Sequence, residues 1–189
     1  MAGVDSRALS TGTGGATITP RGRDGRMAME SVTQRTHGSK QVSDAEISRL
    51  LSRLYEVISF PEGCEPDWSG MTDVFSAHAR ITRITPEGTD YFDLPTFQAM
   101  AQELVRVGAY TAFHESEVAC RVECFGNVAH VASAYETRRD PGARACLGRG
   151  INSLQLVREN DTWRVLSLCW DEEALKERDV RALIGGHHG

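Results

Sequence analysis

The middle of the chain begins with a hydrophobic pattern of helical period. Apolar residues between positions 47 and 58 recur at i, i+3, i+4 and i+7, which predicts an amphipathic helix. Ser43 and Glu46 have the spacing of a capping box at the start of this helix. Pro61 and Gly63 follow its end, where residues that stop a helix are expected.

Three shorter elements are predicted after this helix. A second helix is expected over residues 68–76, and a strand over residues 79–85 that ends in the turn Pro86-Glu87-Gly88. A third helix is expected over residues 94–107, with Asp93 as its N-cap.

Strand patterns fill the remainder of the domain. Gly126-Asn127 and Glu159-Asn160-Asp161 separate pairs of strand-like segments, and these turns predict two β-hairpins. The four strands are expected over residues 111–125, 128–139, 150–158 and 162–171. Helices followed by a long antiparallel sheet indicate an α+β fold and not a parallel doubly wound one.

The turn of the first hairpin predicts which of its residues share a face. If Gly126 and Asn127 form the loop, Phe125 pairs with Val128 and the pairing continues without a gap. One face is then apolar near the turn and polar at its far end, where it carries His114, Ser116, Tyr135 and Thr137. Helices packed on this face would leave its polar end at the mouth of a cavity. Glu115 and Glu136 fall on the opposite face, and a slip of one residue would reverse the two faces.

Both ends of the chain differ from the middle in composition. Residues 1–41 are rich in Gly, Ser, Thr and Arg and show no hydrophobic period, so a disordered tail is expected. The chain ends in Gly185-Gly186-His187-His188-Gly189, and a flexible tail is expected over residues 177–189. A single folded domain is therefore predicted over residues 42–176.

The bulk composition argues against several classes of partner. The 189-residue chain has a net charge of −5, whereas binding of a nucleic-acid backbone requires a basic surface. No apolar run reaches the roughly 20 residues of a membrane span, and the N-terminus lacks the apolar core of a secretory signal. The five cysteines lack the spacing of a disulfide framework, which favours the reducing cytoplasm.

Several short segments occur in the order found in a known family. They are Tyr55-Glu56-Val57-Ile58-Ser59, Asp67-Trp68, Phe125-Gly126-Asn127-Val128-Ala129, Ser133-Ala134-Tyr135-Glu136, Arg149-Gly150-Ile151-Asn152-Ser153-Leu154-Gln155-Leu156, Thr162-Trp163-Arg164-Val165 and Trp170-Asp171-Glu172-Glu173. Through these motifs, residues 43–173 resemble uncharacterised bacterial proteins of the nuclear transport factor 2-like (SnoaL-like) superfamily.

The resemblance implies a cone of curved antiparallel sheet wrapped around three N-terminal helices, with a cavity inside the cone and usually a homodimeric assembly. The superfamily includes polyketide cyclases, a ketosteroid isomerase, dehydratases, an epoxide hydrolase and proteins without catalysis, so the fold does not choose a reaction. Relatives that isomerise ketosteroids keep a carboxylate base on the first strand. The strand over residues 79–85 contains no carboxylate, so that route is not indicated here.

Two residues are candidates for proton chemistry. Histidine is the residue type suited to proton transfer at neutral pH, and the predicted register places His114 at the rim of the cavity. The alternative for His114 is a strand-end histidine bonded to solvent or to Arg139. Tyr135 offers a phenol that can donate a hydrogen bond to a ligand oxygen, and its alternative is a core tyrosine with a satisfied hydroxyl group.

Four residues are candidates for contact with a ligand. Asn152 shares a strand face with Leu154 and Leu156, and an amide on an apolar face needs a partner. Trp68 and Trp170 are candidate flat walls of an apolar cavity. Tyr55 is a fourth candidate, although its apolar neighbours on the first helix favour a packing role.

No cofactor or metal site is indicated. The histidines are scattered, Cys120 and Cys124 have no second pair at zinc spacing, and no glycine-rich phosphate loop lies between a strand and a helix. The leading hypothesis is a homodimer that binds a small, mainly apolar organic molecule. If it is catalytic, its reaction would be metal-free acid/base chemistry such as cyclisation, isomerisation or dehydration. The alternative is a non-catalytic dimerisation or stress-associated module.

Overall fold

The computed structural model describes the main chain of residues 36–172 and the side chains of residues 44–172. This part of the chain contains helices and strands in the order α1 (Thr36–Ile58), α2 (Met71–Val74), β1 (Phe75–Thr85), β2 (Gly88–Phe92), α3 (Leu94–Arg106), β3 (His114–Phe125), β4 (Val128–Arg138), β5 (Gly148–Glu159) and β6 (Thr162–Asp171). Residues 1–35 and the predicted C-terminal tail at 177–189 lie outside the described residues.

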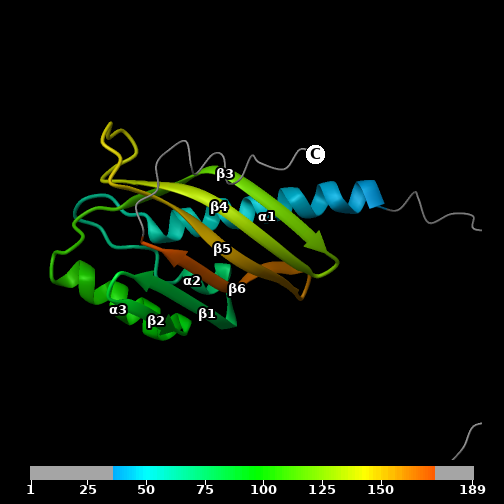
Figure 1. Cartoon of the computed structure of the whole chain (residues 1–189), viewed down its shortest axis with the longest axis horizontal. Helices are drawn as coiled ribbons and strands as arrows, with labels where there is room; N and C mark the ends of the chain where they lie inside the picture. The colour runs from blue at the N-terminus through cyan, green and yellow to red at the C-terminus, as the bar shows by residue number, and fades with distance from the viewer. Residues whose placement is uncertain (1–35, 173–189) are drawn as a thin grey trace, which may run out of the picture. The chain divides into compact units, whose positions relative to one another are not determined.

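The six strands form one sheet in the order β2-β1-β6-β5-β4-β3 (Figure 1). Neighbouring strands are antiparallel except β1 and β6, which are parallel. After β2 and α3 the chain crosses to the far edge of the sheet at β3, and β4, β5 and β6 then follow strand by strand until β6 lies beside β1. The mixed α+β class is therefore confirmed. The predicted strand at 79–85 and the helix at 94–107 after it correspond to β1 and α3, whereas the short strand β2 between them was not predicted.

The local signals in the sequence explain most of the element boundaries. The Asp93 side chain accepts a hydrogen bond from the backbone N–H of Thr96 at 2.9 Å, so it caps α3 as predicted. In the β5–β6 turn, Asn160 and Asp161 have φ values of 47° and 62°, the left-handed conformation that a two-residue hairpin loop requires. Gly126 has a φ of 63° in the β3–β4 turn, which is also formed as predicted.

The start of the first helix differs from the prediction. Helix α1 begins at Thr36, so Ser43 lies inside the helix and residues 36–41 are helical instead of belonging to the tail. A capping box contributes on the order of 1 kcal/mol, and no proline stands between Thr36 and Ser43 to stop the helix from extending past it. The domain therefore begins before residue 42.

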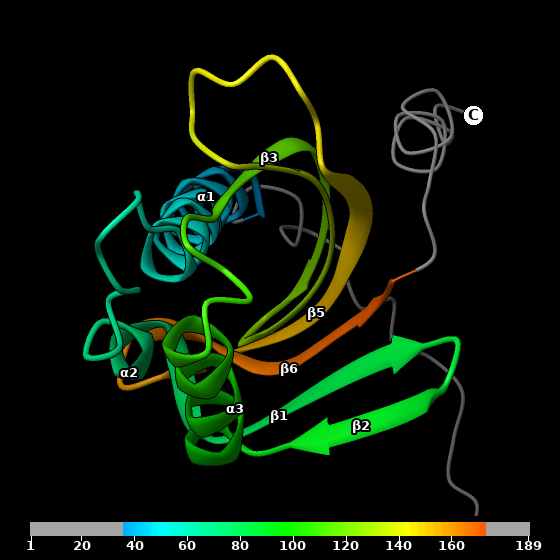
Figure 2. The same ribbon diagram turned by 90° about the vertical axis from the view of Figure 1, so that its left-hand side faces the viewer.

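The sheet is strongly curved, and α1 lies on its concave side, within the arc formed by β3, β4 and β5 (Figure 2). Apolar residues of α1, α2 and the inner strand faces form one core, whose largest fully buried members include Ile47, Leu51, Leu54, Met71, Ile81, Leu154 and Leu156. Burial of each such side chain contributes roughly 1.5–3 kcal/mol relative to exposure. Among the described residues, no helix has the length and apolar character needed to cross a membrane.

Candidate functional site

One extra residue in β3 decides which side chains face the inside of the cone. From Phe125 to Ala119, the pairing of β3 with β4 follows the predicted register. Between Ala119 and Glu117 the register shifts by one residue, so Val118 forms a β-bulge. Val118 and Ala119 both pack against Ala134, which lies on the outer face of the sheet.

The bulge reverses the faces of the last part of β3. Glu117 now pairs with Tyr135, Glu115 pairs with Thr137, and His114 pairs with Arg138. The prediction that His114 and Tyr135 share the inner face is therefore wrong, because a shift of one residue exchanges inside and outside. His114 does not line the cavity, and Glu115 takes the inner position instead.

Glu115 is a buried carboxyl group with one polar partner on its side chain. Its exposed fraction is 8%, and its Oε1 accepts a hydrogen bond from Nδ2 of Asn152 at 3.1 Å. Its other oxygen, Oε2, has no hydrogen-bond partner among the residues that the structure describes. Burial raises the pKa of Glu115 to about 7, with the hydrogen bond from Asn152 acting in the opposite direction.

The backbone at Glu115 is held by the end of α1. The Ser59 hydroxyl donates to the carbonyl of Tyr55 at 2.6 Å, and it accepts from the backbone N–H of Glu115 at 3.0 Å. Next to this link, Phe60 and Phe113 form an isolated antiparallel bridge. The first strand of the hairpin is therefore fixed against the helix that carries Tyr55, which sets the depth of Glu115 in the fold.

Tyr55 and Asn152 form the polar centre of the inner face. Asn152 on β5 is buried and lines the cavity, as predicted. Tyr55 lies behind it, with its hydroxyl 2.6 Å from Oγ of Ser133 and 3.4 Å from Nδ2 of Asn152. Burial raises the pKa of Tyr55, although its hydrogen bonds to Ser133 and Asn152 oppose the rise. The phenol is therefore a neutral hydrogen-bonding group.

Tyr135 lines the cavity from β4 and lies across Gly150 of the neighbouring strand. The two residues are paired in register, and a Cβ atom at position 150 would overlap the Tyr135 hydroxyl and ring. A glycine at this position is what allows the tyrosine to take its place. Burial raises the pKa of Tyr135, and the charges of Glu115, Glu172 and Asp171 raise it further.

These polar groups open into a cavity of about 490 Å³. Its walls are mainly apolar and come from α1, α3, β6 and the segments around them. Trp68 and Trp170, both predicted as walls, line it. Phe97 of α3 meets Trp170 edge to face, with ring centroids 6.2 Å apart. Leu147 and Tyr110 also line the cavity and remain exposed, which places them at its opening.

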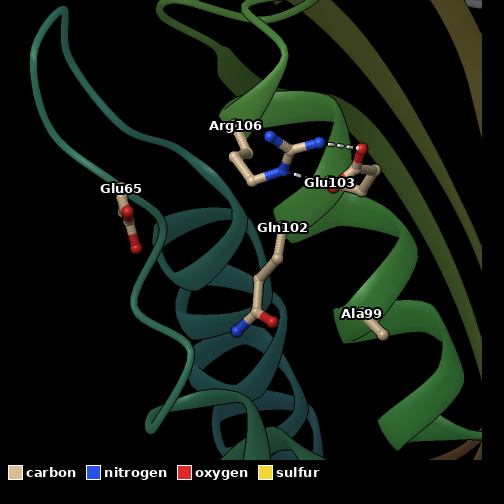
Figure 3. A pocket seen from close by; sticks show the side chains of 5 residues that line it. All are labelled: Glu65, Ala99, Gln102, Glu103 and Arg106. Carbon is tan, nitrogen blue, oxygen red and sulfur yellow. Dashed lines mark hydrogen bonds and ion pairs between the residues drawn. The ribbon is translucent and has the colours of Figure 1, made fainter.

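A second, more open hollow of about 340 Å³ lies along α3 (Figure 3). It is formed by Glu65 from the segment after α1 and by Ala99, Gln102, Glu103 and Arg106 of α3. The Arg106 guanidinium is paired with Glu103 at 2.5 and 2.6 Å, so its charge is already matched. None of the predicted site residues lies here. We therefore assign the candidate site to the larger cavity.

Glu115 is the residue that the pattern of the sequence did not reveal. Glu residues at positions 115 and 117 of a strand predict a face exposed to solvent. The bulge that turns both side chains inward contains no glycine or other residue type that would indicate it in the sequence. A bulge is favoured by the fit of the two strands to the curved sheet, which depends on residues distant in sequence. In residues 44–172, no group of three His, Cys, Asp or Glu side chains is arranged to hold a metal ion.

Comparison with known proteins identifies the fold. No protein-family model and no curated protein matches the chain. Among solved structures, a protein of unknown function from Mycobacterium tuberculosis is 17% identical, with a TM-score of 0.58 over 78% of this chain and 88% of that one. A nuclear transport factor 2-like superfamily protein from Salmonella enterica is 17% identical, with a TM-score of 0.51 over 72% and 95% of the two chains.

The protein LinA is a further structural neighbour. It is 10% identical, with a TM-score of 0.54 over 69% of this chain and 86% of LinA. At these identities the likeness concerns the fold and not the activity. The curved six-stranded sheet with helices on its concave side agrees with these neighbours. The chain therefore has the nuclear transport factor 2-like fold, as its sequence motifs predict.

Proposed function

We propose that the protein binds a small, mainly apolar organic molecule in the cavity and that Glu115 exchanges a proton with it. The observation that carries the proposal is a buried carboxyl group, hydrogen-bonded through Oε1 to Asn152, on the wall of a mainly apolar cavity of about 490 Å³. A cavity of this size lies in the range of small-molecule sites, roughly 300–1,000 Å³.

Glu115 takes the role that the sequence suggested for His114. A carboxyl group with a pKa of about 7 is present in both protonation states at neutral pH, which suits a general acid or base. The Tyr135 hydroxyl would orient a ligand oxygen, and Asn152 would hold Glu115 through its Oε1 atom. Trp68 and Trp170 would supply flat apolar walls. The reaction would be metal-free, of the isomerisation, cyclisation or dehydration type.

The test begins with the discovery of a ligand. Native mass spectrometry of the protein taken directly from its expression host should show an added mass that denaturation removes. With that molecule in hand, Glu115→Gln should lower turnover by about 10²-fold or more, the usual contribution of an acid/base group. Glu123→Gln is the matched control, because Glu123 lies on the same strand and is exposed. Equal effects of the two substitutions would reject the assignment.

The alternative is a non-catalytic dimerisation or stress-associated module. In such a protein Trp68, Phe97 and Met100 would fill the interior, whereas here they line an open cavity. A protein that binds no molecule in a broad ligand screen, with Glu115→Gln unchanged in its cellular effect, would favour this alternative.

We also propose a homodimer that forms through the outer face of the sheet, in the cytoplasm. On that face, Ile151 packs with Ala134, Val118 and Ala119 in a small apolar cluster separate from the core. An apolar cluster outside the concave core supports a second covering surface. The five cysteines of the chain all carry free thiols, which supports a reducing compartment.

A further inference from the structure

A line of hydrogen-bonded side chains connects the cavity to the edge of the sheet. At the cavity end, Nδ2 of Asn152 lies 3.1 Å from Oε1 of Glu115 and 3.4 Å from the Tyr55 hydroxyl. The Tyr55 hydroxyl lies 2.6 Å from Oγ of Ser133, which lies 2.6 Å from Oε2 of Glu117. The β-bulge at Val118 places Glu117 on the inner side of β3, the edge strand.

The chemistry of the donors gives this line one direction. The Glu117 carboxylate only accepts, so the Ser133 hydroxyl donates its single hydrogen to Glu117. Ser133 Oγ must then accept from the Tyr55 hydroxyl, which in turn accepts from Asn152. Both hydrogens of the Asn152 amide are thereby used, one towards Tyr55 and one towards Glu115. The amide is fixed with its nitrogen facing the Glu115 carboxyl group.

We propose that Glu117 is a positioning residue that sets the direction of this line and thereby keeps the exchangeable proton of Glu115 on Oε2. Oε1 accepts from Asn152, so the proton of the neutral acid belongs on Oε2, the oxygen without a partner among the described residues. The catalytic meaning of this arrangement rests on the proposed function. The arrangement itself exists without a ligand and can be tested without one.

The opposite orientation of Asn152 would place the proton elsewhere. Without an acceptor at Glu117, Ser133 is free to donate to Tyr55, and Tyr55 is free to donate to the amide oxygen. The Asn152 amide can then turn its oxygen towards Glu115. In that orientation the amide oxygen would accept a hydrogen bond from Glu115 protonated on Oε1. Loss of a donor to the ionised carboxylate favours the neutral acid, so the pKa of Glu115 should rise.

Removal of the Glu117 charge alone would lower the pKa of Glu115, whereas the proposed reorientation of Asn152 would raise it. The sign of the change in this pKa therefore distinguishes the proposal from a direct effect of charge. Removal of a neighbouring negative charge lowers the pKa of a carboxyl group. The titratable and charged groups around Glu115 and along its cavity come from several elements: Tyr55 of α1, Arg83 of β1, Glu117 of β3, Tyr135 of β4, Arg149 of β5, Asp171 of β6 and Glu172. The hydrogen bond from Asn152 acts on the pKa of Glu115 more directly than any of these charges.

The pKa of a neighbouring thiol agrees with an inward position of Glu117, although Glu117 is exposed. Burial raises the pKa of the Cys120 thiol to about 12, and the charge and hydrogen bond of Glu117 contribute to that rise. Cys120 pairs with Ser133 across β3 and β4, on the inner face. The carboxylate therefore lies beside the Ser133 hydroxyl and not in the solvent on the outer face.

The experiment is a pH titration of the Glu115 carboxyl carbon by ¹³C NMR, with the resonance assigned by its loss in Glu115→Gln. Glu117→Ala, Ser133→Ala and Tyr55→Phe each break the line at a different link. Each should raise the pKa of Glu115 by about 0.5 or more, the effect of one lost hydrogen bond. Glu123→Ala is the matched control on the same strand and should leave that pKa unchanged.

A double variant separates transmission through the line from a direct effect. In the Tyr55→Phe background, Glu117→Ala should cause no further rise in the pKa of Glu115. A fall or no change in Glu117→Ala alone would overturn the proposal, and so would a full additional rise in the double variant. Because Glu117 is exposed on an edge strand, Glu117→Ala remains informative if Ser133→Ala does not fold. Failure to find a ligand leaves these results intact, so the two proposals fail separately.

Discussion

Replacing Glu115 by glutamine should make the protein more stable at alkaline pH and leave its stability nearly unchanged at acidic pH. Glutamine has the shape of the protonated acid, and its carbonyl oxygen can accept the hydrogen bond that Asn152 donates to Oε1. Unlike glutamate, it never acquires a charge in the buried site. The difference between the two proteins is therefore the free energy of ionising Glu115 inside the fold.

The pKa of Glu115 sets the size of this difference and its pH range. Because its pKa is raised, the folded protein binds the proton more tightly than the unfolded chain, so stability falls as pH rises from the unfolded pKa to the folded one. The rise of about 2.5, from 4.5 to about 7, corresponds to on the order of 3 kcal/mol once both values are passed. Below pH 4.5 both states are protonated and the difference vanishes.

Urea unfolding of the two proteins at pH 5 and pH 8.5 measures this effect. At pH 8.5 the Glu115→Gln protein should unfold at higher urea, with a thermal midpoint roughly 10 °C above that of the parent. At pH 5 most of this advantage should be lost. Glu123→Gln, an exposed residue of the same strand, should show no such pH dependence. A stability difference that is constant with pH would refute the burial of an ionisable carboxyl group at position 115.

Three further outcomes are expected. Gly150→Ala should displace Tyr135 and cost roughly 1–3 kcal/mol of stability, whereas Gly142→Ala, whose Cβ would meet only the Asp140 side chain at 3.4 Å, should cost little; equal urea midpoints would contradict the packing of Tyr135 on Gly150. Sedimentation should give a dimer mass at micromolar concentration, and Ile151→Lys on the outer face should give a monomer; a monomeric parent protein would remove the dimer proposal. Deletion of residues 1–35 should shift the thermal midpoint by less than about 5 °C, and a larger drop would mean that these residues pack on the domain.

Local signals in the sequence were sufficient for most of the elements. The helical spacing of apolar residues predicted α1, and Asp93 caps the predicted helix α3 as expected. Gly126-Asn127 and Glu159-Asn160-Asp161 predicted both hairpin turns, because only a few residue types adopt a positive φ without strain; in the second turn Glu159 pairs with Thr162, and the loop is Asn160-Asp161. The family motifs added the curved sheet around the helices, and the structural neighbours agree with the fold that they imply.

The same local signals gave the correct register only for the part of the hairpin next to its turn. From Ala119 to Phe125 the pairs follow from the Gly126-Asn127 loop. Beyond that point, the bulge at Val118 exchanged the faces of β3 and brought Glu115 inward in place of His114. Tyr135 and Asn152 kept their predicted places in the cavity, since β4 and β5 pair without a shift. Trp68 and Trp170 also line the cavity.

The sequence by itself therefore determined most of the elements, the turns and the inner faces of the regular strands, because these depend on residues close together in the chain. The tertiary structure determined the bulge at Val118, and the bulge in turn places Glu115 and not His114 in the cavity. A bulge adds one unpaired residue to a strand and is stabilised by the curvature of the whole sheet around α1. The raised pKa of Glu115 has the same origin, since it arises from burial under elements that the local sequence around Glu115 does not contain.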